Sequence, residues 1–317
     1  MVMFARQVAL LLLAAKQAIA FTPLPAVPRS LNTIKRGVCR GRNSVVAAAP
    51  ITCGCSVLSS TAALGSSALA ALCSTPTSSS AIKGLAMNTA LFAPLVLKGQ
   101  SMLTATGVLS AWVLGSILWA TLGWQGWSVC VVYLLAGSMV TKVKMTEKTE
   151  LGISEGRGGR RGPENVWGSA ATGALCALAT QRWPAQRSLL VLGFVASMST
   201  KLSDTFQSEI GKAYGKRCFL ITSLKPVPRG TEGAVSLEGY LAGIVGSLVI
   251  AVVAAALRLI DLKSVGITAI AALIATTSES LIGATFQDNV KWLTNEVVNF
   301  ILTVIGAAAA VALKVIF

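Results

Sequence analysis

Long apolar runs alternate with polar segments from about residue 84 to the end of the chain. Runs of about 20 apolar residues are needed to cross a bilayer, and a lipid-embedded backbone must satisfy its own hydrogen bonds, which favours helices. A weaker run at 84–97 contains Asn88 and Pro94 and is an eighth, less apolar candidate. The pattern predicts an all-α, polytopic transmembrane helix bundle over residues 84–317, with about seven spans: 101–122, 124–141, 165–181, 188–207, 237–260, 265–286 and 297–317.

The overall composition agrees with a membrane protein and narrows its chemistry. The chain is 54% hydrophobic and 12% charged, whereas soluble domains carry about 25% charged residues. A net charge of +15 suggests nucleic acid as a partner, but aromatic residues make up only 6% and no stacking motif is present, so we expect no nucleic acid. Because the chain has no histidine, histidine acid–base catalysis and histidine-containing metal sites are excluded.

The charges of the loops predict an orientation. If the seven spans alternate in direction, the long loops share one side of the membrane and the short turns share the other. Twelve basic residues fall on the long-loop side and four on the other, so the long loops face the compartment from which the protein was inserted. The long loops are 142–164, 208–236 and 287–296, and the short turns lie near 123, at 182–187 and at 261–264.

The first part of the chain has the composition of a targeting leader. Residues 1–20 combine Arg6, a short apolar core and the small-residue site Ala18-Ile19-Ala20, which predicts a signal peptide. Residues 21–83 are rich in Ser, Ala, Arg and Lys and contain no acid, which is typical of a disordered transit peptide. The junction "AIAFTP" resembles that of bipartite plastid presequences in algae with secondary plastids. We therefore expect a plastid membrane protein with its long loops in the stroma; a disordered secretory leader is the alternative.

Carboxylates at the ends of the spans are the first candidate site. Acids inside a membrane are costly and therefore suggest function. Asp204 follows Lys201 by three residues, so both lie on one helix face. In the structural alternative these two form a self-neutralising pair and Glu279 is a packing residue. In the functional interpretation a carboxylate cluster binds Mg²⁺ together with substrate phosphates, and its ligands are Asp204, Glu209, Glu279 and Asp288.

Two basic, glycine-containing loops lie on the same side as these carboxylates. They are "SEGRGGRRGPENVWG" at 154–168 and "GKAYGKRCFLITSLKPVPRGTEGAVSLEG" at 211–239. Glycines let backbone N–H groups approach phosphates, and helix starts favour anions. Neither loop matches a P-loop, and contact with lipid headgroups is the alternative. The predicted phosphate ligands are Arg160, Arg161, Lys212, Lys216, Lys225, Arg229, Gly230 and Thr231.

The motifs "KLSDTFQSEIGKAYGK", "KPVPRGTEGAVSLEG" and "SESLIGATFQD", together with "RRGPENVWGSAATG", resemble a known family. They are similar to the phytyl-phosphate kinases of plant plastids, in the integral membrane family that includes transmembrane protein 19. The resemblance runs from about Gly156 to the C-terminus. It implies phosphoryl transfer from CTP to phytyl monophosphate, giving phytyl diphosphate for tocopherol and phylloquinone synthesis. The prenyl chain of this substrate would lie among the spans, in contact with membrane lipid.

The residue types are consistent with that reaction and suggest roles. The acceptor is itself a phosphate, so it needs no strong base. The acceptor and CTP are both polyanions, and bringing them together requires a metal ion and cationic side chains. Asp204 and Glu279 are the predicted catalytic residues. These roles follow from the residue types and not from the resemblance. A kinase acting on phytol or another prenyl alcohol stays open, and there an acid would serve as base. A transporter or flippase of phosphorylated isoprenoids also stays open, because "TFQSE" and "TFQDN" suggest an internal repeat.

Overall fold

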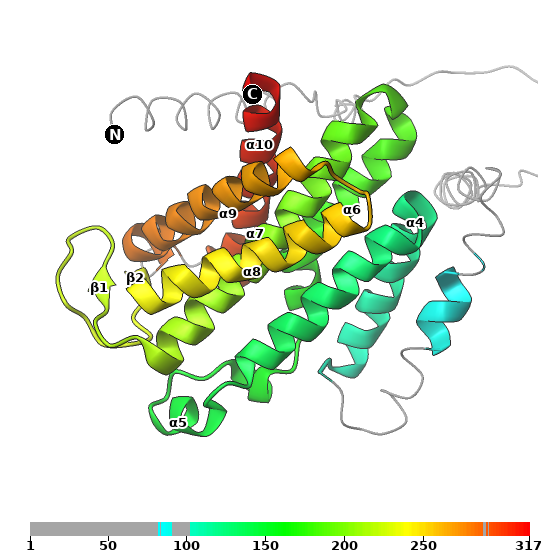
Figure 1. Ribbon diagram of the computed structural model, residues 1–317. Coiled ribbons are helices and arrows are strands. Elements are labelled where there is room, and N and C mark those ends of the chain that lie inside the picture. The colour runs from blue at the N-terminus through cyan, green and yellow to red at the C-terminus, as the bar shows by residue number, and fades with distance from the viewer. Residues whose placement is uncertain (1–81, 83, 91–101, 288–289, 291) are drawn as a thin grey trace, which may run out of the picture. The chain divides into compact units, whose positions relative to one another are not determined.

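The computed structural model describes residues 82, 84–90, 102–287, 290 and 292–317, and within the unit 59–317 these form a bundle of helices (Figure 1). The predicted signal peptide and, apart from residue 82, the predicted transit peptide lie outside the described residues. The all-α prediction is confirmed, with one short two-stranded sheet added. The elements are α4 (Ala105–Thr141), α5 (Met145–Glu150), η1 (Gly156–Gly159), α6 (Pro163–Arg182), η2 (Pro184–Gln186), α7 (Arg187–Tyr214), β1 (Phe219–Leu220), β2 (Ala234–Val235), α8 (Leu237–Ala256), α9 (Leu262–Ile282), the π-helical η3 (Gly283–Gln287) and α10 (Asn295–Ile316).

Helix α4 is interrupted at Gly123, where the sequence predicts a turn between two spans. Gly123 has a φ of +72°, which glycine adopts readily because it lacks a Cβ. The Trp119 and Trp127 rings lie 5.4 Å apart on either side of this residue. Trp127 Nε1 also donates to Asn88 Oδ1 at 2.6 Å. The weak apolar run near 84 therefore contributes a short helical segment, 84–90, that packs against α4.

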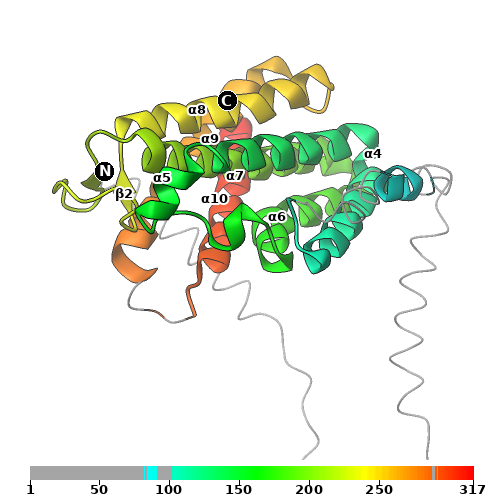
Figure 2. The ribbon, with the colours of Figure 1, turned by 90° about the horizontal axis from the view of Figure 1, so that it is seen from below.

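Helix α7 lies at the centre of the bundle and contacts α4, α6, α8, α9 and α10; Figure 2 shows it between α8 and α6. Every residue from Val191 to Ser203 is buried. Glycines allow the neighbouring helices to approach closely, as small residues do in membrane bundles. A Cβ at Gly239 or Gly246 of α8 would lie within 3 Å of an α7 carbonyl oxygen. The polar residues of α7 are thereby enclosed by more apolar helices.

Seven separate spans are not confirmed. Four helices are long and apolar enough to cross a membrane by length and composition: Ala105–Thr141, Leu237–Ala256, Leu262–Gln287 and Asn295–Ile316. Helices α6 and α7 occupy the predicted runs 165–181 and 188–207 and have sufficient length. Both are more polar than the four helices above. In α7 the polar residues are shielded, because every residue from Val191 to Ser203 is buried within the bundle. By contrast α8 exposes Leu237, Leu241 and Val245 along one side.

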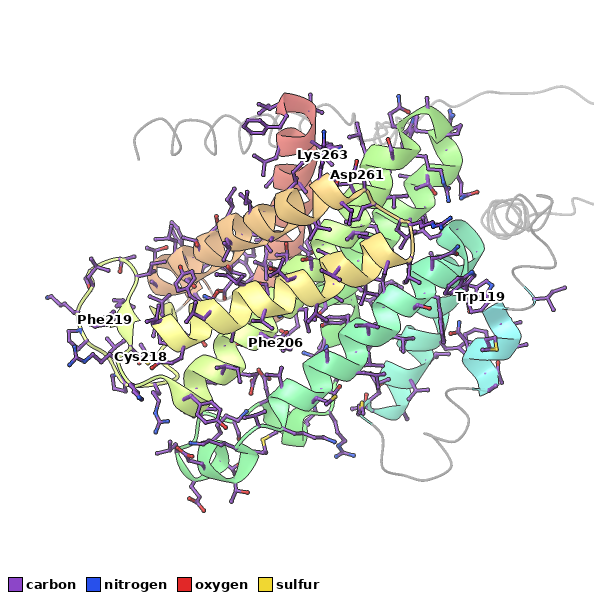
Figure 3. The ribbon with its side chains drawn as sticks, viewed as in Figure 1. Trp119, Phe206, Cys218, Phe219, Asp261 and Lys263 are labelled. Carbon is purple, nitrogen blue, oxygen red and sulfur yellow. The ribbon has the colours of Figure 1, made fainter. Side chains whose placement is uncertain are left out.

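The two ends of the α8–α9 pair differ in character. Asp261 and Lys263 mark the tight turn between these helices, and Cys218 and Phe219 mark the loop end beyond the start of α8 (Figure 3). At the loop end β1 pairs with β2 in antiparallel register, Phe219 opposite Val235. This pairing positions the loop 221–233 beside the ends of α7 and α9. The candidate site lies at this end.

Candidate functional site

A polar cleft of about 470 Å³ lies where the central helix meets the long loops. Helices α7, α9 and α10 supply its inner wall, and the segments 154–161 and 230–236 supply its outer wall. Residues of α4 and α6, among them Tyr133 and Asn165, complete the lining, so two distant loops and five helices converge on one space. The side chains most relevant to chemistry in this cleft are Arg161, Lys201, Asp204, Lys212, Glu279 and Asn299.

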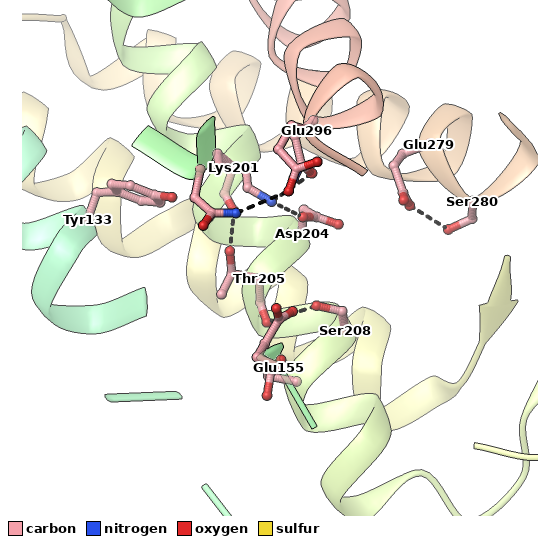
Figure 4. Close-up of polar contacts among 12 residues, drawn as sticks. Tyr133, Glu155, Lys201, Asp204, Thr205, Ser208, Glu279, Ser280 and Glu296 are labelled. Carbon is pink, nitrogen blue, oxygen red and sulfur yellow. Dashed lines mark hydrogen bonds and ion pairs between the residues drawn. The ribbon is translucent and has the colours of Figure 1, made fainter. Parts of the chain in front are cut away.

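Lys201 forms the centre of the inner wall. Its Nζ donates to Asp204 Oδ2 at 2.5 Å and to Asn299 Oδ1 at 2.8 Å (Figure 4). The residue is only 8% exposed, so its ammonium group is held in place by these two acceptors. The predicted Lys201–Asp204 pair is therefore present, and both members also line the cleft. Sequence reasoning treated Lys201 only as a counter-ion and missed Asn299, although a polar residue inside the apolar run 297–317 was a usable signal.

Glu279 joins Asp204 in the same cleft from a different helix. It lies near the end of α9, a helix that packs against α7. Ser280 Oγ donates to Glu279 Oε2 at 3.4 Å, and Figure 4 shows both acids on this side of the bundle. The structure therefore brings together the two residues that were predicted to be catalytic. Their roles stay predictions.

Glu209, a third predicted metal ligand, does not line the cleft. Glu209 is almost fully buried and forms an ion pair with Lys148, which also donates to the Thr141 carbonyl oxygen at 2.7 Å. Glu209 is absent from the cleft lining, so its position indicates a packing role that the sequence did not predict. Asp288 lies outside the described residues.

Arg161 is fixed at one edge of the cleft. Its Nη1 donates to the Tyr133 hydroxyl at 2.5 Å, and its guanidinium lies 5.0 Å from the centre of the Tyr133 ring. The backbone of Arg161 also bonds to Met102 and Thr104, at 3.0 Å each. Gly137 permits this placement, because a Cβ there would lie 2.6 Å from Arg161 Nη2. Arg160 also lines the cleft, but it is exposed.

The second basic loop divides into two groups of residues. Lys212, Gly230 and Thr231 line the cleft, as predicted. Gly230 has a φ of +85°, and Gly233 has a φ of +70° and lies against Ala284 at the end of α9. Both glycines therefore lie in a tight loop that borders the cleft.

The remaining predicted phosphate ligands lie away from the cleft. Lys216 and Lys225 are exposed and do not line it. Arg229 Nη1 donates to Glu147 Oε1 at 3.3 Å and to two carbonyl oxygens at the end of α7. Hydrogen bonds from Lys144, and then from Arg229, hold the pKa of Glu147 below its ordinary value. Arg229 therefore has partners within the protein that occupy its guanidinium.

The donor set of the cleft fits one divalent cation only in part. Within the described residues no group of three or more Asp, Glu, Cys or His side chains could hold a metal ion, and Asp288, one of the four predicted ligands, lies outside these residues. Asp204 and Glu279 are hard oxygen donors in one cleft. Magnesium is commonly held by one or two carboxylates, with water and substrate phosphates completing its octahedron. The two carboxylates fit that kind of shared site.

A polar central helix that opens into a charged cleft, within a bundle of long apolar helices, defines an α-helical integral membrane protein whose candidate site is this cleft. The chain belongs to the integral membrane protein DUF92 family, whose profile matches residues 87–307.

Three relatives match most of the chain. It is 53% identical over 234 residues to the uncharacterized membrane protein sll0875 of Synechocystis, covering 74% of this chain and 91% of the relative. It is 43% identical over 244 residues to the chloroplastic protein VTE6 of Arabidopsis thaliana, covering 75% and 72% respectively. A more distant relative, the uncharacterized membrane protein MJ0933 of Methanocaldococcus jannaschii, is 28% identical over 220 residues, covering 68% and 88%. No solved structure matches the chain significantly.

Proposed function

We propose that this protein is a CTP-dependent phytyl-phosphate kinase of a plastid membrane. The observation that carries the proposal is the cleft itself, in which fixed cations and several carboxylates, among them Asp204 and Glu279, meet at one end of a membrane helix bundle. A prenyl phosphate is an anionic headgroup on an apolar chain, and such a molecule meets a nucleotide at this kind of boundary. The 43% identity to a chloroplastic relative and the motifs that resemble phytyl-phosphate kinases support the same assignment.

The proposed reaction transfers one phosphoryl group between two polyanions. A phosphate oxygen of phytyl monophosphate attacks the γ-phosphorus of CTP, the bond from that phosphorus to the β-phosphate oxygen breaks, and phytyl diphosphate and CDP are formed. The attacking oxygen is already ionised at neutral pH, so no general base is needed. Catalysis then consists of positioning and charge neutralisation. Lys201, Arg161, Lys212 and the exposed Arg160 are cations of the cleft that we propose for this task.

Asp204 and Glu279 are the proposed ligands of Mg²⁺. One oxygen of Asp204 accepts from Lys201, which leaves Oδ1 available. When bound, magnesium would neutralise phosphate charge as the phosphoryl group is transferred. Lys201 keeps the Asp204 side chain in place, and the Asn299 amide oxygen holds Lys201 in turn.

The location follows from the same reasoning. We place the protein in a plastid membrane with the cleft facing the stroma, because the basic loops adjoin it and nucleotides are supplied there. The leader is then a bipartite one, with the signal peptide at 1–20 removed before the transit peptide at 21–83 acts. A processed N-terminus beyond residue 80, read by mass spectrometry of plastid membranes, would support this; an N-terminus near residue 21 on a secreted protein would contradict it.

The activity is tested with purified protein in lipid nanodiscs, given phytyl phosphate, CTP and Mg²⁺. We expect phytyl diphosphate and CDP in equal amounts. Absence of product from folded protein would refute the kinase, product from phytol but not from phytyl phosphate would indicate the alcohol kinase, and prenyl-phosphate transfer across liposomes without CTP consumption would indicate the transporter.

The two carboxylates are tested by Asp204→Asn and Glu279→Gln, with Glu150→Gln on the exposed face of α5 as the matched control. Each cleft variant should lose turnover by about a hundredfold or more, since electrostatic groups in such sites contribute that much. Thermal unfolding should show folded protein in all three variants. Wild-type rates in both cleft variants would overturn the metal assignment while leaving the enzyme assignment intact.

A further inference from the structure

A narrow apolar slot adjoins the cleft between the two halves of α4 and helix α6. Its volume is about 40 Å³, and its apolar walls include Leu114, Cys130 and Leu134 from α4 and Val166 and Ala170 from α6. The two helices pack against each other directly. A slot of this size is far smaller than the about 300 Å³ of an ordinary ligand pocket. It therefore accommodates a short length of slender hydrocarbon and excludes a bulky or polar group.

The slot and the cleft are continuous through three polar residues. Tyr133, Arg161 and Asn165 line both spaces. The Arg161 guanidinium is held against Tyr133, as described above, so a positive charge is fixed at the junction. A molecule that occupies both spaces must then carry an anionic group next to an apolar chain.

We propose, on the basis of the proposed function, that the slot binds the carbons of the prenyl phosphate nearest its phosphate, and that Arg161 holds that phosphate. The rest of the chain continues along the apolar surface of α4 and α6 into lipid. Lys212, Gly230 and Thr231 line the cleft but not the slot. These residues are left for the nucleotide, so the acceptor and the donor approach from opposite sides of the cleft.

The far end of the slot is closed by a specific packing arrangement. Asn88 accepts from Trp127 Nε1 at 2.6 Å and donates to Ser116 Oγ at 3.2 Å. Gly115 leaves room for it, because a Cβ there would lie 2.6 Å from Asn88 Oδ1. Because this end is closed, the chain leaves the slot sideways. The slot then recognises the beginning of the chain and not its length.

Filling the slot should weaken acceptor binding without affecting the nucleotide. Cys130→Trp and Ala170→Leu fill it from two different helices, and Leu109→Trp on the exposed face of α4 is the matched control. The two filling variants should raise KM for phytyl phosphate about tenfold or more, since apolar pockets discriminate by such factors. KM for CTP should stay within about twofold, and KM for geranyl phosphate, whose chain is shorter, should rise by the same factor. An unchanged KM in both folded variants would refute the slot.

A photocrosslinking experiment tests the slot independently of turnover. A phytyl phosphate analogue with a diazirine close to the phosphate is irradiated with the wild-type protein in nanodiscs, without nucleotide, and the labelled peptides are sequenced. Labels should fall in 111–134 and 166–170. If the labels were confined to α8 or α9 on a protein that forms diphosphate, the proposed binding of the prenyl chain in the slot would be refuted and the proposed function would stand. Labels in the slot of a protein that forms no diphosphate would overturn the proposed function and leave prenyl-phosphate binding standing.

Discussion

The buried ion pair between Lys148 and Glu209 gives the most direct stability prediction. Lys148 is fully buried, and its Nζ contacts Glu209 Oε2 and the Thr141 carbonyl oxygen. The pair joins the short helix α5 to the central helix α7. Since α5 begins the loop that carries Arg161, this contact also sets the position of one wall of the cleft.

Removing one partner leaves an uncompensated buried charge. In Lys148→Met the nearest remaining cation to Glu209 in this arrangement is Lys212, with its Nζ 4.0 Å from Oε1. Breaking a buried pair in this way costs about 3–5 kcal/mol of unfolding free energy. For a bundle of this size that lowers Tm by roughly 10 °C. The double variant Lys148→Met with Glu209→Leu removes both charges and should recover most of the loss, because paired residues are not additive.

The assay is thermal unfolding of detergent-solubilised protein, with Lys142→Met as the control because Lys142 is an exposed lysine just before α5. The single variants should unfold well below the control and the double variant close to it. Magnesium dependence of product formation is measured in parallel with Glu209→Gln. If Glu209→Gln unfolded normally and required far more magnesium, Glu209 would be a metal ligand and the packing role would be wrong.

Two further predictions concern the bundle away from the cleft. Gly306→Ala should destabilise the α7–α10 contact by about 1–3 kcal/mol, because its Cβ would overlap the Thr200 hydroxyl; thermal unfolding measures this, and Gly266→Ala, which meets nothing within 4 Å, is the control. The Lys314 side chain lowers the pKa of Asp261 to about 2. Because the folded pKa lies below the unfolded value of about 3.9, the stabilisation is full above that pH and is lost as the pH falls towards 2. The pair is exposed, so Asp261→Asn should lower the free energy of unfolding by less than about 1 kcal/mol. The variant should also show a smaller decline of Tm between about pH 4 and 2.

The fold was largely predictable because a helix that crosses lipid needs a run of about 20 apolar residues, and such runs are visible in the sequence. The apolar runs located each long helix, and Gly123 marked the turn inside α4. Helix ends were less predictable. The run at 188–207 becomes a helix that continues to Tyr214, because Glu209 is shielded by packing and Lys148 neutralises it. Hydropathy reports neither the packing around Glu209 nor its ion pair with Lys148.

The candidate site was predictable as a location and not as a set of contacts. Asp204, Glu279 and Lys212 line one cleft, and the sequence grouped them because each lies near the end of an apolar run on the same side. Glu209 and Arg229 are also an acid and a base on this side. They differ from the cleft residues because they pair with residues 61 and 82 positions away in the chain. No local pattern reveals such pairing. The distinction between a ligand and a packing residue therefore required the folded arrangement.

The position of Lys201 explains why the central helix is more polar than α8, α9 and α10. A cation that stabilises phosphate charge works best when its orientation is fixed before the substrate arrives, and Asp204 and Asn299 fix it. Three polar groups at one level of a bundle are tolerated only where other helices exclude lipid from them. The residues that make α7 more polar than α8, α9 and α10 are therefore among those that form the cleft, and a low hydropathy in a central helix is itself a signal for the site.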